Sequence, residues 1–463
     1  MAFLSRRKID MGQGPVARTL FSLALPSMAS MLFHTLFHII DTVFVSWLGE
    51  APMAAMALTF PVAFIVFALV NGIGTGATSL ITQNLGADRP EEAKAYGTSS
   101  LSLMLLLSSI ALPLLSPRLA LPFYESLGGT PEVARECYRY SLWIIASFPF
   151  MGFSVFADSL FRSQGDTVTP MYGLIIGNGL NIVLDPLFIF TFGWGIAGAA
   201  AATLLGRIAS CIYLASRLKG HSEIPLGLAF DSSFFRRWRD VAAIGLPVSF
   251  SQVSMATSGM LINKTLSLFG PAAIAAWMLG NRIEGLAFLP AFGLNGALVP
   301  FVGYNLGKGD DGRIRQGMKA SIAFSMAIMA VIGFFLYLFP AFFLAPFRPT
   351  AEVTHLATLS IRASVLSYLF VAVDLVFWGV FQGSGYSLWG LAAQSIRALL
   401  FRVPLAVAFA RAWGVQGVWW FQPLSAALSL TVSSLIMTQV LKRIRLRTAA
   451  APLGSEPSST TTR

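Results

Sequence analysis

Long apolar segments are the feature that most constrains this chain. Runs of 20 or more predominantly apolar residues recur from Leu20 to Val440. A helix needs about 20 such residues to cross the hydrocarbon core of a bilayer. With 55% hydrophobic residues, 11% charged residues and a mean hydropathy of +0.70, the chain is predicted to be an all-α integral membrane protein.

Clusters of glycine, proline and charge divide the chain into twelve predicted transmembrane helices. The first six cover 18–46, 53–81, 95–116, 135–161, 168–190 and 194–216. The second six cover 241–264, 272–303, 318–343, 355–382, 387–410 and 413–441. Because the number of spans is even, both termini are expected on one side of the membrane.

The net charge of +11 does not indicate a nucleic-acid partner, because the basic residues lie in short connections and tails. When charges at the span ends are counted with the adjoining connections, the segments on the side of the N-terminus hold 21 Lys and Arg, those on the other side hold 6, and 5 lie deeper within spans. Basic residues accumulate in cytoplasmic segments of membrane proteins. We therefore predict a multi-pass protein of the cell inner (plasma) membrane, with the lipid bilayer as its partner and both termini cytoplasmic.

The two halves of the chain resemble each other at a nearly constant distance. ALPSM around Pro26 recurs as GLPVS around Pro247, and TQNLG at 82–86 recurs as GYNLG at 303–307. Six spans return the chain to its starting side, so the repeat is parallel and its pseudo-twofold axis runs along the membrane normal. The predicted organisation is an N-tail 1–17, a six-helix lobe 18–216, a cytoplasmic linker 217–240, a six-helix lobe 241–441 and a C-tail 442–463.

Two aspartates of the first half lie inside predicted spans. Asp41 in span 1 and Asp185 in span 5 each stand about five residues from the outer end, so they share a depth. Ionisable groups within a membrane are expensive and mark functional sites by default. No arginine in either span neutralises them. A role limited to capping or bridging helices is the alternative for each aspartate.

Further oxygen donors are predicted at the same depth. Asn178, Asn181 and Asp185 fall on one stripe of their helix at 100° per residue, and Thr203 on the next span reaches a similar level. Pro186 removes a backbone N–H and frees a carbonyl of the preceding turn. We expect Asp41, Asn181, Asp185 and Thr203 to bind a proton or a sodium ion, with Asn178 as a possible accessory.

His34 and His38 share the helix face of Asp41. Their spacing would suit a metal, but no fourth ligand is evident, so no metal site beyond a possible sodium ion is predicted. A role as pH-sensitive neighbours of Asp41 and a role in packing both remain open.

The second half does not copy these acids. At the repeat distance Asp41 becomes Ile262, and Asp185 becomes Pro404 or Leu405. Its spans instead contain charges of both signs: Arg282, Glu284, Arg362, Asp374, Arg397 and Arg402. We expect most of these to form structural ion pairs, with Asp374 the strongest exception. Asp374, Arg282 and Glu284 are each expected to be either a substrate contact or a structural charge.

The most specific stretches are FRSQGDTVTPM at 161–171, IIGNGLNIVLDPLFIF at 175–190 and GIAGAAAAT at 195–203. With them the chain, from about Pro15 to Leu441, resembles the multidrug and toxic compound extrusion (MATE) transporters. The aspartate of span 1 and the N-x-x-x-D-P of span 5 look most like the DNA-damage-inducible protein F branch. The resemblance implies that Asp41, Asn181, Asp185 and Thr203 form the cation site of the N-terminal lobe.

The expected function is export of cationic or amphipathic drugs and toxic compounds in exchange for protons or sodium, by alternating access between two lobes of a monomer. The alternative is a flippase or exporter of a lipid-linked saccharide or another amphipathic metabolite from the same superfamily. An enzyme is not expected, because no nucleophile, acid and base gather at one depth, and no cofactor is implied.

Overall fold

The computed structural model describes residues 8–221 and 233–450. These residues form α-helices joined by short turns, with no strand anywhere in the two ranges. The linker residues 222–232 and the terminal residues 1–7 and 451–463 lie outside the described chain, so the expectations for those parts of the tails and linker are not addressed.

The first half contains eight α-helices. They are α1 (Val16–Ser46), α2 (Glu50–Gly86), α3 (Pro90–Ser108), α4 (Pro117–Ser126), α5 (Pro131–Ala146), α6 (Phe148–Ser163), α7 (Val168–Pro186) and α8 (Ile196–His221). A 3-10 turn, η2 (Leu112–Leu115), continues α3, and a π-helical turn, η3 (Leu187–Thr191), continues α7.

The second half contains ten α-helices. They are α9 (Phe234–Leu266), α10 (Pro271–Ala287), α11 (Leu289–Gly307), α12 (Asp311–Leu338), α13 (Pro340–Leu344), α14 (Ala351–Val365), α15 (Tyr368–Gly383), α16 (Ser387–Ser395), α17 (Val403–Val418) and α18 (Phe421–Ala450). A π-helical segment, η6 (Ile396–Arg402), joins α16 to α17.

The twelve predicted spans are confirmed as apolar helices. Within residues 8–221 and 233–450, ten helices are long and apolar enough to cross a membrane, and two bent pairs, α10 with α11 and α14 with α15, bring the number to twelve if each pair is one span. These pairs bend by 48° and 56°. The short helix α4 between the third and fourth spans has no counterpart in the sequence prediction.

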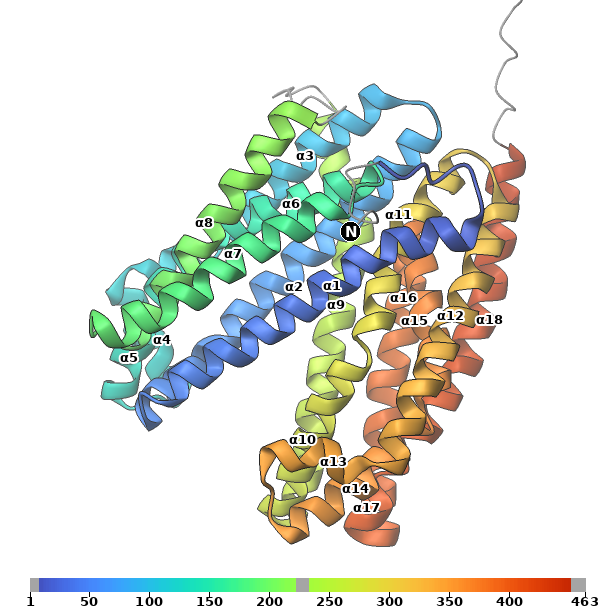
Figure 1. Cartoon of the computed structure of the whole chain (residues 1–463). Coiled ribbons are helices and arrows are strands. Elements are labelled where there is room, and N and C mark those ends of the chain that lie inside the picture. The colour runs from blue at the N-terminus through green and yellow to red at the C-terminus, as the bar shows by residue number, and fades with distance from the viewer. Residues whose placement is uncertain (1–7, 222–232, 451–463) are drawn as a thin grey trace, which may run out of the picture.

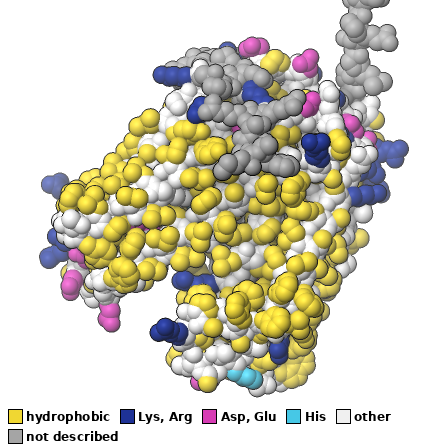
Figure 2. Space-filling model, viewed as in Figure 1, with side chains coloured by type: hydrophobic (Ala, Val, Ile, Leu, Met, Phe, Trp, Pro, Cys, Tyr) yellow, Lys and Arg dark blue, Asp and Glu magenta, His cyan; other side chains and the backbone are white. Residues whose placement is uncertain are grey.

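The helices form two lobes that meet at one end and separate at the other (Figure 1). The first lobe contains α2–α8 and the last turns of α1, and the second contains α10–α18, most of α9 and the first half of α1. Figure 2 shows a hollow between the lobes, open at the end away from the start of α1 and the end of α18. The described chain therefore begins and ends at the closed side of the molecule.

Small residues bring the lobes together at the closed end. The helix α2 packs against both α9 and α11 of the other lobe. A Cβ atom on Gly245 would lie 2.8 Å from the carbonyl oxygen of Gly72, and one on Gly307 would lie 1.9 Å from that of Gln83. Glycines let backbones approach this closely within a membrane. The repeated glycines of TQNLG and GYNLG thus form part of the closed seam.

The helix α1 belongs to both lobes. Its first half packs into the second lobe, where Leu20 and Leu23 join a buried cluster with Leu294 and Leu298. Its last turns pack into the first lobe through Val45. The lobes are therefore not separated cleanly at the linker, and any relative motion of the lobes must act on α1 near Pro26, which lies between these two regions.

The segment before α1 lies across the seam as an extended strap, defined here as residues 8–14. Its Met11 is 3% exposed, and the carbonyl of Met11 accepts hydrogen bonds from Asn305 Nδ2 and Arg313 Nε, both at 3.1 Å. At its other end, the N–H of Ile9 donates to the carbonyl of Gly165 in the first lobe at 3.2 Å. The strap therefore links the two lobes at their closed end.

Candidate functional site

The chain stays helical after Pro186, the last residue of α7. The proline keeps helical dihedrals, φ −64° and ψ −31°, and the chain continues as the π-helical turn η3. Proline cannot donate the hydrogen bond that an α-helix needs at this point. A π-helical turn is rare and often occurs at functional sites, and here it directly follows Asp185.

The structure brings together Asn181, Asp185 and Thr203, as the sequence predicted. Asp185 and Asn181 are 0% and 1% exposed. With its amino group facing the carboxylate, the Asn181 side chain donates to Asp185 Oδ2 at 3.0 Å. Its amide oxygen then accepts from the hydroxyl of Thr203 at 3.2 Å. The amide thus connects α8 to the carboxylate on α7.

Asp41 lies on α1, which packs against α7, and its side chain is 6% exposed. The carboxyl groups of Asp41 and Asp185 are close enough to influence each other electrostatically. Neither acid forms an ion pair with a basic side chain in residues 8–221 and 233–450. The first lobe therefore holds two neighbouring buried carboxyl groups without a paired cation.

Tyr140 on α5 and Arg207 on α8 are two further polar residues of this lobe that the sequence reasoning did not select. Tyr140 lies within electrostatic reach of Asp41, Asp185 and Arg207. Arg207 donates from Nη1 to the hydroxyl of Ser147 at 2.6 Å. The sequence places Arg207 inside span 6, a position that marks it as a candidate functional residue. It lies on a different span from either aspartate, so periodicity along one helix does not connect it to them.

The two histidines of α1 contact each other. Their Nε2 atoms are 3.3 Å apart, so one ring must donate and the other accept. The described residues contain no group of three or more His, Cys, Asp or Glu side chains that could hold a metal ion. Asn178, the possible accessory, has a buried amide nitrogen with no protein partner, so the structure does not include it in the Asn181 network.

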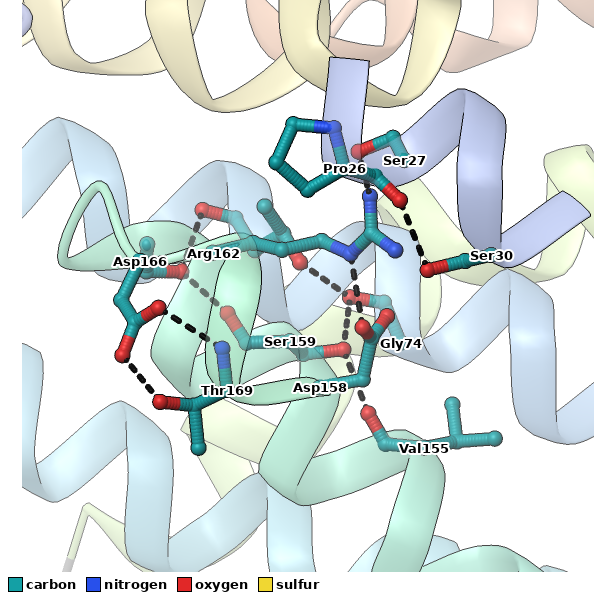
Figure 3. A network of polar contacts seen from close by, with 12 residues as sticks. Pro26, Ser27, Ser30, Gly74, Val155, Asp158, Ser159, Arg162, Asp166 and Thr169 are labelled. Atoms are coloured by element: carbon teal, nitrogen blue, oxygen red, sulfur yellow. Dashed lines mark hydrogen bonds and ion pairs between the residues drawn. The ribbon is translucent and has the colours of Figure 1, made fainter. Parts of the chain in front are cut away.

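The FRSQGD motif ties α1 to the first lobe (Figure 3). Arg162 donates to the hydroxyl of Ser27, beside Pro26, and to Asp158, both at 2.7 Å. Asp166 accepts hydrogen bonds from the backbone N–H groups of Val168 and Thr169 at the start of α7. This motif therefore organises the helix ends at the closed side rather than the carboxylate site.

In the second lobe, Asp374 is paired. It is 4% exposed, accepts from the Ser429 hydroxyl at 2.7 Å, and its Oδ2 lies 3.8 Å from Arg397 Nη1. The expectation that Asp374 would stand outside the ion pairs is therefore wrong, because η6, which carries Arg397, packs against α18 beside α15.

Arg282 and Glu284 do not form a unit. Arg282 is exposed, whereas Glu284 lies within electrostatic reach of Arg397 and Arg402. Residues two apart on a helix point about 200° apart, so one of the two faces the lobe interior and the other does not.

The first-lobe site consists of oxygen and amide groups: two carboxyls, one amide and one hydroxyl. Carboxylates buried away from water favour either protonation or a bound cation, since an uncompensated negative charge is costly there. The arrangement can therefore hold a proton or a small hard cation. It contains no nucleophile next to a positioned base.

Both halves of the chain match one known protein family. The family model MatE matches twice, at residues 26–187 and 247–408. The two matches are displaced by 221 residues, which is the distance between the ALPSM and GLPVS repeats.

Two curated relatives cover almost the whole chain. The multidrug export protein MepA of Staphylococcus aureus is 25% identical over 94% of this chain and 97% of its own length. A protein named FAD transporter from Shewanella oneidensis is 25% identical over 91% of this chain and 93% of its own length.

The fold matches a solved structure described as the outward-facing conformation of a multidrug resistance MATE family transporter. The TM-score is 0.90 at 26% identity, covering 95% of this chain and 99% of that structure. The lobes, the closed seam and the hollow thus have a close counterpart in a transporter structure.

Proposed function

Since the chain belongs to the MATE family, whose members are transporters rather than enzymes, we propose that it is a secondary antiporter. In this proposal it exports cationic or amphipathic drugs and toxic compounds in exchange for protons or sodium ions. It works as a monomer in the plasma membrane with both termini in the cytoplasm.

One observation carries the coupling proposal. Asp41 and Asp185 lie buried on two helices in contact, without a basic partner among the described residues, and Asp185 has the Asn181 amide in contact. Two neighbouring carboxylates repel each other, so a proton or a cation between them lowers the free energy of the site. Because Asp41 is on α1 and Asp185 on α7, occupation of the site changes how these two helices pack.

Alternating access is supported by the asymmetry of the two ends. The glycine-lined seam and the strap hold the lobes together on the side of the described chain ends, while the hollow opens on the other side. With cytoplasmic termini this is an outward-open state. Ion binding must favour one of the two states by a few kcal/mol for the switch to be substantial.

Drug export is favoured by the name of the relative MepA, and we extend the proposal to the DNA-damage-inducible protein F branch on the D-P motif of α7. A second candidate, export of an amphipathic metabolite, is favoured by two observations. One relative is named FAD transporter, and Arg207 places a guanidinium in the first lobe that could meet an anionic group.

Reconstituted vesicles test the coupling. Dye efflux would be measured under a pH gradient or a sodium gradient alone, for the natural protein, Asp41→Asn and Asp185→Asn. We expect one gradient to drive flux and both variants to lose that drive while eluting as folded protein. Glu136→Gln, which changes a carboxylate paired with Arg139 at a less buried position of the same lobe, is the matched control.

Normal coupled flux in both aspartate variants would refute the coupling proposal. Flux of FAD or a related anionic metabolite without any flux of cationic dyes would favour the second candidate.

The strap tests alternating access. Arg313→Ala removes three hydrogen bonds to the carbonyls of Met11, Gln13 and Gly14. We expect the closed seam to open more often, so that a cysteine placed on α2 at the seam reacts faster with a soluble maleimide. Arg315→Ala, which removes only a surface pair with Asp311, is the control and should leave the labelling rate unchanged.

A further inference from the structure

The second lobe contains a cluster in which acids and arginines balance; Asp374 in it is buried, and Glu284, Arg397 and Arg402 are half-buried. Asp374 on α15 faces Arg397 at 3.8 Å and the Ser429 hydroxyl at 2.7 Å. Glu284 on α10 interacts electrostatically with both Arg397 and Arg402. The cluster therefore has two carboxylates and two guanidinium groups, a formally neutral set.

The π-helical segment η6 explains how both arginines face this cluster. Arg397 and Arg402 are five residues apart, which corresponds to about 140° of rotation on an α-helix. A π-helix bonds residue i to i+5, so residues five apart lie nearly above each other. Arg402 is fixed further by the Phe421 ring, whose centroid is 5.6 Å from its guanidinium carbon.

The first lobe differs in this respect. Its two buried acids have an amide and a hydroxyl nearby, but among the described residues no basic group pairs with either of them. The second lobe has the same kind of buried carboxylate with a guanidinium that is part of the chain.

We propose that Arg397 is a tethered counter-ion that occupies, at Asp374, the place that a free coupling cation takes in the first lobe. The comparison with the first lobe rests on the proposed function, whereas the exclusion of a free cation at Asp374 does not. As a consequence, the protein couples transport to ion binding through one lobe only.

A tethered cation excludes a free one for two reasons. It is present at a high effective concentration, because it cannot diffuse away from its partner. A free cation that displaced it would also leave a buried guanidinium without its carboxylate, which is strongly unfavourable.

The cluster has what a cation would need once the guanidinium is gone. Asp374 Oδ1 is buried and has no protein partner, and Ser429 and Ser433 lie four apart on α18 beside the carboxylate. Carboxylate and hydroxyl oxygens suit hard cations. Replacing Arg397 by an apolar side chain of similar length should therefore create a sodium site.

The experiment measures thermal unfolding of the purified protein in sodium chloride against choline chloride at constant ionic strength. The background is Asp41→Asn with Asp185→Asn, which removes the first-lobe acids. In this background we expect no sodium-dependent stabilisation. Adding Arg397→Met should produce a saturable one, and a site half-filled at ~10 mM sodium would stabilise the folded state about tenfold at ~100 mM.

Two variants complete the test. Adding Asp374→Asn to the Arg397→Met protein should abolish the sodium effect, and Arg397→Lys, which keeps the positive charge, should not produce one. Absence of the gain in folded Arg397→Met protein overturns the proposal.

A second arm needs no change at Arg397. If the background protein with its intact arginine is stabilised by sodium, and Asp374→Asn removes that stabilisation, a free cation binds at Asp374 and the proposal fails. A failure of the proposed function would give a different result. The natural protein and Asp41→Asn/Asp185→Asn would then show the same coupled flux, whatever sodium does to the stability of the Arg397 variants.

Discussion

The two lobes share their helix order, and each has a π-helical turn beside a proline, η3 after Pro186 and η6 before Pro404. Their buried acids have different partners. In the first lobe, Asp41 and Asp185 lie buried on helices in contact, and Asp185 has an amide as its partner, whereas in the second lobe Asp374 faces Arg397. The two halves have thus kept a repeated sequence pattern while their polar interiors diverged.

The two lobes differ in whether a buried acid has a basic side chain as its partner. A buried carboxylate without a cationic partner favours binding a proton or a cation from solution, and this binding links the site to an ion gradient. A carboxylate with an attached arginine has no such need, and it contributes to holding α15, η6 and α18 in place. The comparison predicts that equivalent substitutions in the two lobes have different consequences.

The largest expected effect is that of Asp185→Asn on transport. The variant keeps the shape of the side chain but cannot hold a proton or balance a cation, so ion-driven dye flux in vesicles should fall to background. Its thermal stability should stay close to that of the natural protein, because no buried arginine loses a partner. Ion-driven flux that survives in this variant would show that Asp185 does not couple transport to the ion, so the first lobe would not differ from the second in this respect.

The next effect concerns stability in the second lobe. Asp374→Asn leaves Arg397 buried without its carboxylate, so unfolding in detergent should become easier by about 3–5 kcal/mol. Asp374→Asn with Arg397→Met removes both charges and should recover most of this loss. A double variant as unstable as the single one would show that the two residues do not act as a pair.

A smaller effect is expected at the amide between α7 and α8. Asn181→Ala removes a hydrogen bond to Asp185, which is worth about 1 kcal/mol or roughly a fivefold loss in apparent affinity for the driving ion. The half-saturating ion concentration of vesicle flux measures this. Asn178→Ala, one turn earlier and outside the network, serves as the control and should leave it unchanged.

The smallest effect on ion affinity is expected at Thr203, where two substitutions distinguish the role of the hydroxyl from that of the methyl group. Thr203→Val removes the hydrogen bond to Asn181 and should weaken ion affinity by about 0.5–1.5 kcal/mol. Thr203→Ser keeps the hydroxyl and should change it by less than ~0.5 kcal/mol. Equal effects of the two substitutions on the flux titration would mean that the hydroxyl does not take part.

The sequence by itself determined the number and approximate positions of the spans, because an apolar run of sufficient length has only one way to satisfy its backbone in a membrane. The limits were less exact: the last span, predicted from residue 413, begins at Phe421. It also determined that the chain is a repeat, since Pro26 and Pro247 stand in corresponding contexts. The grouping of Asn181 and Asp185 followed from helical periodicity, which fixes neighbours on one helix.

Contacts between helices were decided only by the tertiary structure. The sequence did not indicate that Arg397 meets Asp374, because a five-residue spacing to Arg402 looks misaligned until the π-helical turn is known. It also gave no sign that the first half of α1 packs into the opposite lobe, or that the strap at Met11 crosses the seam. Hydrophobicity specifies which residues leave water, but lateral packing and helix rotation decide which of them meet.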